Sequence, residues 1–219
     1  MEIIKSELCS DQPIGRISIL KGPSRSGKSN LVRDLIFHCK QCVFVYAHVG
    51  LINSLDNYDL LTSLIEFKNE QNRKIVLIIE DGDELLVGRM RDNINLISRL
   101  LNTADGIYSD LLDMRFVITT NAKSDDIDIA IKERLSAMIH VGELPTKEAN
   151  LALQAILGNP NDKGLHDVFT KSTLLGHVYK KARELGWKPP PSQATKTTEV
   201  FLTSRARKLK TSRKAYRVG

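Results

Sequence analysis

A glycine-rich stretch near the amino terminus combines the residue types that bind phosphate groups. It reads G-x-x-x-x-G-K-S and consists of Gly22, Pro23, Ser24, Arg25, Ser26, Gly27, Lys28 and Ser29. Glycines let the backbone approach an anion closely, and the amides of the loop and of the following helix start point at phosphate oxygens. Lys28 adds a positive charge for the β- and γ-phosphates, and the Ser29 hydroxyl is a ligand for Mg²⁺. The stretch therefore predicts a nucleoside triphosphate site.

Two acidic residues follow an unbroken apolar stretch in the middle of the chain. Residues 75–79 read I-V-L-I-I, and Glu80 and Asp81 come directly after them. A strand without polar alternation is covered on both faces, as in a parallel sheet, and open parallel sheets bind ligands at the carboxyl ends of their strands. Of two acids there, one can position Mg²⁺ and the other can orient or deprotonate an attacking water. We therefore expect Glu80 and Asp81 to form the second half of the site.

The segments that must position these residues alternate between strand and helix patterns. Apolar, β-branched segments predict strands at 16–21, 42–46, 75–79, 115–120 and 138–141. Helical spacing predicts helices from the phosphate loop to about residue 38, from about residue 60, over 92–104 and over 127–135. Turn-forming residues predict a loop over 49–60. This alternation predicts an α/β fold with a doubly wound, five-stranded parallel sheet.

After Pro145 the strand pattern ends. Helical patterns cover 147–157 and 174–185, and the triple proline at 189–191 cannot continue a helix. The remaining residues are polar and basic, a composition typical of a disordered extension. We therefore expect three parts, which are an α/β nucleotide-binding domain at 1–143, a small α-helical lid at 144–187 and a basic tail at 188–219.

The net charge of +6 is unevenly distributed along the chain. Residues 180–219 hold 12 Lys and Arg against 2 Asp and Glu, whereas the rest of the chain holds 20 against 24. The positive charge therefore belongs to the tail. Basic tails bind polyanions by neutralising phosphates, so nucleic acid is a candidate partner. A solvated extension and a peptide that docks on an acidic protein remain the alternatives.

The composition argues against a membrane or secreted protein. No apolar run reaches membrane-spanning length, and the first residues lack the pattern of a signal peptide. Three cysteines among 219 residues fit a reducing compartment, so we expect a cytoplasmic location. Cys39 and Cys42 form a lone C-x-x-C pair, which would need Cys9 and His38 to complete a zinc site, and we expect plain thiols instead.

Five segments together resemble motifs of the AAA+ ATPases, and of the AAA branch in particular. They are the strand and loop at 15–29, the apolar strand with its acids at 77–85, the L-L-N-T-A-D-G segment at 100–106, the I-T-T-N segment at 118–121 and the segment 127–134. The order Glu80-Asp81, where most relatives have Asp-Glu, is similar to that of the mitochondrial AAA translocases for the Rieske iron–sulfur protein. The resemblance covers roughly residues 14–185. It implies a P-loop NTPase of the AAA+ type that hydrolyses ATP with Mg²⁺.

The resemblance also implies roles for single residues. Glu80 would support Mg²⁺ together with Ser29, and Asp81 would polarise the attacking water. Asn121 would hold that water near the γ-phosphate. Arg134 would act as an arginine finger in the site of a neighbouring subunit, which implies a homo-oligomer with a hexamer as the expected state. Two plainer alternatives stay open, a strand-end cap for Asn121 and a surface ion pair for Arg134.

The sequence does not identify the substrate. Residues 50–53 read G-L-I-N and lack the aromatic residue that peptide-threading relatives carry in their pore loop. Only about 15 residues precede the first predicted strand, so no large substrate domain is expected there. We expect an ATPase that remodels or loads an unidentified macromolecule. The alternatives are a small nucleoside or nucleotide kinase, and an adaptor whose ATP site controls assembly with little turnover.

Overall fold

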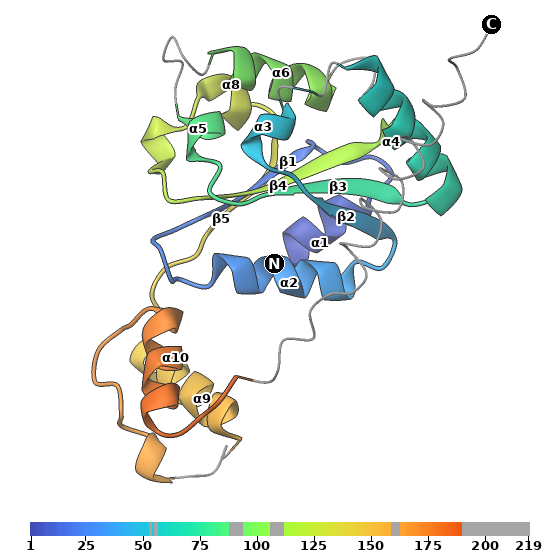
Figure 1. The fold of residues 1–219 in the computed structure, drawn as a ribbon. Coiled ribbons are helices and arrows are strands. Elements are labelled where there is room, and N and C mark those ends of the chain that lie inside the picture. The colour runs from blue at the N-terminus through green and yellow to red at the C-terminus, as the bar shows by residue number, and fades with distance from the viewer. Residues whose placement is uncertain (53, 55–56, 88–93, 106–111, 159–162, 190–219) are drawn as a thin grey trace, which may run out of the picture. The chain divides into compact units, whose positions relative to one another are not determined.

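A five-stranded parallel sheet forms the centre of the fold (Figure 1). The computed structural model describes residues 1–52, 54, 57–87, 94–105, 112–158 and 163–189 of the chain. The strands are β1 Ile17–Lys21, β2 Cys42–Tyr46, β3 Lys74–Ile79, β4 Met114–Thr120 and β5 Leu135–His140. They lie in the order β2-β3-β4-β1-β5, and every neighbouring pair is parallel. The predicted α/β fold with a five-stranded parallel sheet is confirmed.

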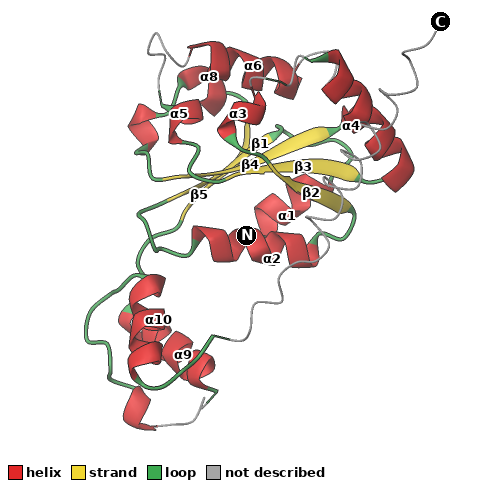
Figure 2. Cartoon of the chain, in the orientation of Figure 1, coloured by secondary structure: helices red, strands yellow, loops and turns green. Residues whose placement is uncertain are grey.

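Helices cover both faces of this sheet (Figure 2). One face carries α1 Glu2–Cys9 and α2 Lys28–His38. The other face carries α3 Val49–Ile52, α4 Tyr58–Gln71, α5 Asp83–Leu86, α6 Ile94–Asp105 and α8 Ile129–Lys132. The later helices are α9 Thr146–Leu157 and α10 Leu175–Glu184, and 3₁₀ turns occur at Ser124–Asp126 and Lys163–Leu165.

The contacts divide the chain into two units, Met1–Ala182 and Arg183–Gly219. The predicted lid helices correspond to α9 and α10. The predicted domain boundaries near residues 143 and 187 stay predictions. The predicted disordered tail lies almost entirely outside the described residues, as does Gly106 at the end of the L-L-N-T-A-D-G segment.

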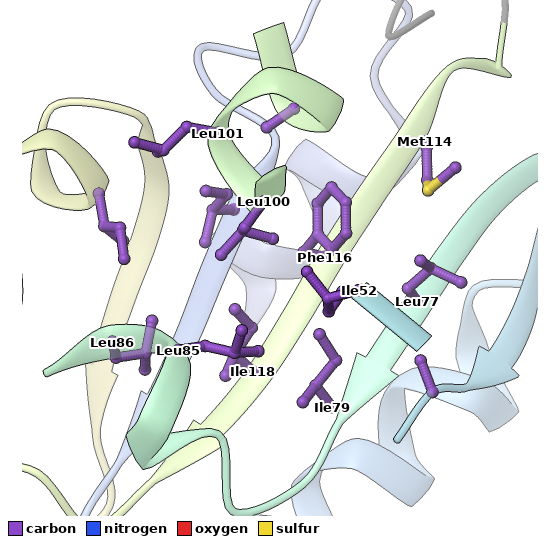
Figure 3. Close-up of a cluster of buried hydrophobic side chains, with 14 of the residues drawn as sticks. Ile52, Leu77, Ile79, Leu85, Leu86, Leu100, Leu101, Met114, Phe116 and Ile118 are labelled. Atoms are coloured by element: carbon purple, nitrogen blue, oxygen red, sulfur yellow. The ribbon is translucent and has the colours of Figure 1, made fainter. Parts of the chain in front are cut away.

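Two apolar clusters, one on each face of the sheet, form the core. On one face Leu77 and Ile79 of β3 pack with Phe116 of β4 beneath α5 and α6 (Figure 3). On the other face the alternate β3 residues Val76 and Ile78 pack against α1 and α2. Since successive strand residues point to opposite faces, both sets must be apolar. This two-sided burial explains the unbroken I-V-L-I-I stretch.

The amino-terminal helix α1 is an element that the sequence patterns did not predict. Ile4 and Leu8 bury its inner face in the second cluster. The guanidinium of Arg115 on β4 caps its carboxyl end by donating hydrogen bonds to the backbone oxygens of Glu7, Leu8 and Ser10. Lys74 Nζ donates to the backbone oxygen of Cys9 at 3.0 Å. Both cations lie where the helix dipole is negative, so they stabilise the docked helix.

We expect an Arg115→Met variant to lose about 3 kcal/mol of unfolding free energy, because removing a buried charge leaves its partners unpaired. Arg115 is only 1% exposed. Urea unfolding followed by circular dichroism measures the loss. Arg33→Met serves as the matched control, since Arg33 is exposed and its substitution should stay within about 0.5 kcal/mol. Equal unfolding midpoints for the two variants would refute this account of α1.

Two predicted segments differ in the structure. The helix predicted over 127–135 is wrong in extent, because α8 has a single turn and Leu135 already pairs with Ile17 of β1. The carboxylate of Asp128 accepts a hydrogen bond from the amide of Ala130 at 2.8 Å and fixes the start of this short helix. The loop predicted over 49–60 contains α3, whose Ile52 is fully buried, and the first residues of α4.

The three cysteines are free thiols close to α1. Burial raises the pKa of Cys39 to about 11 and the pKa of Cys42 to about 12. The Cys42 thiol donates to the backbone oxygen of Leu8 at 3.3 Å. Among the described residues, no group of three or more His, Cys, Asp and Glu could hold a metal ion. Within the same residues, no helix is long and apolar enough to cross a membrane.

Candidate functional site

Three neighbouring strands end at one edge of the sheet, and each leads into a predicted part of the site. β1 leads into the phosphate loop at 22–29, β3 into Glu80 and Asp81, and β4 into Asn121. Because β3, β4 and β1 are adjacent and parallel, their carboxyl ends lie side by side. Open α/β sheets bind ligands at this edge. The structure thus brings the loop, the acids and Asn121 together.

The phosphate loop has a backbone that suits an anion. Gly27 has a φ of 111°, and a Cβ there would lie 2.8 Å from Leu175 Cδ2, so this position favours glycine. α2 begins directly afterwards, and its first amides face the loop end without helical partners. Ser26 Oγ is buried and has no hydrogen-bond partner in the described part of the chain. The loop therefore offers donors that a phosphate oxygen would satisfy.

Lys28 is the central cation of the site. Its side chain is mostly buried, and Nζ donates to the backbone oxygens of Gly22 at 2.8 Å and Pro23 at 2.9 Å. Nζ also donates to Asn121 Oδ1 at 2.9 Å, which links the start of α2 to the residue after β4. Burial lowers the pKa of Lys28. The negative charges of Asp81, Asp83 and Glu80 oppose this shift, and we call residues 80–83 the acid turn. A triphosphate in the loop would compete with these oxygens for the ammonium.

Glu80 and Asp81 are exposed at the end of β3. Asp81 has a φ of 51°, in the left-handed region that residues other than Gly, Asn and Asp rarely adopt. Its amide donates to Thr119 Oγ1 at 3.1 Å, and the next amide, of Gly82, donates to the Thr119 backbone oxygen at 2.8 Å. The acid turn is therefore fixed to the end of β4. Burial raises the pKa of the Tyr46 phenol, and the Glu80 carboxylate adds to this shift.

Asp83 is a site residue that sequence reasoning missed. It begins α5, and its Oδ1 accepts hydrogen bonds from Thr120 Oγ1 at 2.6 Å and from the Asn121 amide at 3.0 Å. The signal available in the sequence was a third acid close behind Glu80 and Asp81, after a glycine. That spacing did not show that the carboxylate reaches the next strand.

Arg134 lies at the opposite edge of the sheet. It directly precedes β5, where Leu135 pairs with Ile17 at the amino end of β1. Leu135 and His140 are five steps apart along the strand, a rise of about 16 Å at ~3.3 Å per residue. Arg134 Nη1 donates to the backbone oxygen of Ala130 at 3.0 Å. The structure therefore does not bring Arg134 to the phosphate loop of its own chain.

The start of α10 contacts the phosphate loop. The Gly176 amide donates to the backbone oxygen of Arg25 at 2.9 Å. Arg25 has a φ of 65°, which aims its carbonyl away from the usual strand or helix direction. Leu175 packs directly over Gly27. The phosphate loop therefore contacts the first residues of α10. The sequence patterns did not predict this contact.

The residues present fit a Mg²⁺–triphosphate. The loop supplies amides, a buried hydroxyl and the ammonium of Lys28 for the phosphates. The Ser29 hydroxyl in the first turn of α2 and the Glu80 carboxylate offer hard oxygen atoms of the kind that would suit Mg²⁺. Mg²⁺ takes one or two protein oxygens and fills its octahedron with phosphate oxygens and water. A site of this kind needs no larger cluster of acids.

The sheet, the loop after β1 and the acids after β3 together define a P-loop NTPase. The family model for the "ATPase family associated with various cellular activities (AAA)" matches residues 18–143, which is more than half of the chain. The chain belongs to this AAA family. The family resemblance read from the sequence motifs is confirmed.

Other comparisons bear on the fold and not on the substrate. A chain of the E. coli MS115-1 HORMA:CdnC:Trip13 complex matches with a TM-score of 0.51 and 15% sequence identity. The match covers 80% of this chain and 61% of that chain, so this chain spans less than two thirds of its structural neighbour. At such low identity the match shows the fold alone. A search of the curated proteins finds no match.

Proposed function

We propose that the chain is a Mg²⁺-dependent ATP hydrolase that works as a homo-oligomer. One observation carries the proposal. Lys28 of the phosphate loop donates a hydrogen bond to the asparagine that follows β4, with Lys28 Nζ 2.9 Å from Asn121 Oδ1, and the residues after β3 are bonded to the same strand end. A loop that only bound a nucleotide would not need carboxylates and an amide oxygen at the same edge. Membership of the AAA family supports ATP as the nucleotide.

Nucleotide binding is assigned to the phosphate loop. The amides of residues 24–29 and the buried Ser26 hydroxyl would donate to phosphate oxygens, and Lys28 would contact the β- and γ-phosphates. Arg25 is exposed within the loop, where its side chain can reach the same anion. The glycines 22 and 27 keep the backbone close to the phosphates.

Hydrolysis is assigned to the end of β3 and to Asn121. When bound by Ser29 and Glu80, Mg²⁺ would neutralise charge on the β- and γ-phosphates. Asp81 would orient the attacking water and accept its proton, and Asn121 Oδ1 would hold the water on its other side. The left-handed turn fixes the backbone of Asp81 to the end of β4, next to Asn121, which supports a shared role of the two residues in holding the water.

Product analysis tests this function against the kinase alternative. We would incubate the chain with ATP and Mg²⁺, with and without nucleoside monophosphates, and separate nucleotides and phosphate by ion-exchange chromatography. The proposal predicts ADP and inorganic phosphate in equal amounts without any acceptor. ADP formation only with a monophosphate would favour a nucleotide kinase. Bound ATP that stays intact would favour an assembly adaptor.

The place of Arg134 supports the proposed homo-oligomer. Arg134 lies at the amino end of β5, about 16 Å of strand from the edge that holds the phosphate loop, so we assign it to the site of a second copy. An assembly in which each copy offers Arg134 to the next is head-to-tail and closes into a ring or extends as a helix. A hexamer is the state that the AAA family resemblance implies.

The macromolecule that such an oligomer would remodel or load is proposed from the charge of the tail. Between residues 205 and 217 the sequence has seven basic residues and no acid. Tyr216 and Phe201 add aromatic rings that can stack on bases. We propose nucleic acid as the partner of this segment, and we keep a cytoplasmic location as a prediction.

We expect truncation after Pro191 to remove nucleic-acid binding and to leave basal ATPase activity unchanged, because all proposed site residues lie upstream. Fluorescence anisotropy with labelled single-stranded and duplex DNA compares the two proteins across salt concentrations. Binding by the full chain should fall by about 0.7–0.9 log units per log unit of salt for each phosphate contacted. Equal binding by the truncated protein would rule out the tail as the nucleic-acid site and favour a protein-docking extension.

A further inference from the structure

A hydrogen-bonded chain of three residues crosses the site. The Asp83 carboxylate accepts from the backbone amide of Asn121 at 3.0 Å, and the Asn121 side chain accepts from Lys28 Nζ at 2.9 Å. Asn121 thus links Asp83 to Lys28 of the phosphate loop through two hydrogen bonds. Its negative charge also helps to hold the proton on Lys28, against the effect of burial on the pKa of that lysine.

The same carboxylate fixes the residue before Asn121. Thr120 is fully buried, and its hydroxyl donates to Asp83 Oδ1 at 2.6 Å. The oxygen of that hydroxyl in turn accepts from the Ala122 amide at 3.0 Å. The backbone on both sides of Asn121 is therefore held through one acceptor, Asp83 Oδ1. A hydrogen bond to a charged acceptor is stronger than one between neutral groups, so this contact can hold the strand end in place.

The position of Asp83 is itself fixed by packing. A Cβ at Gly82 would lie 2.5 Å from Ile118 Cγ2, so only glycine lets the acid turn lie this close to β4. The Gly82 amide donates to the Thr119 backbone oxygen at 2.8 Å. The amides of Asp81 and Gly82 thus donate hydrogen bonds to the end of β4, and the Asp83 carboxylate accepts the one from Asn121.

We propose that Asp83 is a positioning residue that sets the place of Asn121 for hydrolysis. The inference rests on the proposed ATPase function and adds a residue that the acid pair does not include. Asp83 acts through Asn121 and not on the reacting atoms, because its Oδ1 already accepts two donors from β4. Without this acceptor the Asn121 side chain loses its fixed place beside Lys28. A displacement of about 1 Å at such a position can cost about 10²-fold in rate.

Kinetics of five variants test this inference. Asp83→Ala should lower kcat about 10²-fold while KM for ATP changes little, because the phosphate loop stays intact. Asp83→Asn keeps an acceptor oxygen at the same place and should restore most of kcat. In the Asn121→Ala background, Asp83→Ala should have almost no further effect, since both changes remove the same contribution. Asp125→Ala, at an exposed acid near the same edge, is the matched control and should be as active as the parent.

Two outcomes overturn the proposal. Multiplicative losses in the Asp83→Ala, Asn121→Ala double variant would show that Asp83 acts independently of Asn121. An Asp83→Asn variant as slow as Asp83→Ala would show that the charge or the proton of Asp83, and not its place, is what matters. Thermal unfolding of each variant identifies any loss caused by misfolding. Asp83→Asn keeps the same shape, so it provides a folded comparison if Asp83→Ala proves unstable.

Backbone amide exchange separates this inference from the proposed function. In deuterium oxide, the Asn121 amide should exchange faster in Asp83→Ala than in the parent chain, and Asp83→Asn should restore its protection. Unchanged exchange would refute the contact itself. Absence of ATP hydrolysis by the parent chain would refute the proposed function, and the exchange result would still decide whether Asp83 positions Asn121.

Discussion

An Arg134→Ala variant is expected to bind ATP normally and to hydrolyse it about 10³–10⁵-fold more slowly, the range that arginine fingers contribute in related NTPases. The physical reason is the place of Arg134 at the amino end of β5, where it is too far away to stabilise charge in its own phosphate loop. In the proposed homo-oligomer its effect would come through a second copy of the chain. Steady-state phosphate release and ATP binding by isothermal titration calorimetry measure the two properties separately.

Subunit mixing provides the control for this prediction. Arg134→Ala subunits have intact acids, and Asp81→Asn subunits have an intact arginine, so a mixture should regain activity at junctions that combine both. Sedimentation with ATP shows whether the variants still assemble. A monomeric chain with full activity at every protein concentration would contradict the shared site. Lys132→Ala, at the last residue of α8 and two residues before Arg134, is the neighbouring control and should hydrolyse ATP at the parent rate.

An Asp81→Asn variant should keep ATP binding and lose about 10²–10⁴-fold in turnover, because an amide cannot accept the proton of the attacking water. The substitution is structurally conservative, since asparagine tolerates the left-handed φ of 51° at this position. The backbone hydrogen bond from residue 81 to Thr119 is also kept. ATP binding and single-turnover hydrolysis, measured on the same preparation, test the prediction.

A Glu80→Gln variant shows which of the two acids supports Mg²⁺ and which accepts the proton of the attacking water. In the proposed arrangement Glu80 supports Mg²⁺, so its variant should need more Mg²⁺ and recover part of its rate when Mg²⁺ is raised. If Glu80→Gln is inactive at all Mg²⁺ concentrations and Asp81→Asn hydrolyses ATP normally, the two roles are reversed. The Glu-Asp order makes this comparison informative, because each acid is one methylene longer or shorter than in most relatives.

The fold and the centre of the site follow from local sequence signals. The loop at 22–29 has a fixed spacing, and the apolar stretch at 75–79 must be buried on both faces, so a parallel sheet with acids at its edge was predictable. Asn121 was predictable because it ends the next apolar strand. In each case the residues that carry the signal are neighbours in the sequence.

What the sequence did not show depends on contacts between distant residues. α1 has only two buried apolar residues, and the cations that hold its carboxyl end, Lys74 and Arg115, come from strands far along the chain. Asp83 contacts Thr120 across 37 residues, which no spacing rule reveals. The helix predicted over 127–135 was too long because Leu135 continues the apolar pattern, although its partner is a strand.

The central claim is that the Lys28 loop and the β3 acids hydrolyse ATP, and phosphate release by the parent chain and its Lys28→Ala variant tests it most directly. The account predicts steady release by the parent chain with Mg²⁺, none after Mg²⁺ is removed with EDTA, and none with Lys28→Ala, because Lys28 is the buried loop cation assigned to the β- and γ-phosphates. Phosphate release by Lys28→Ala at the parent rate, or no release by the parent chain at any protein concentration, would contradict the account.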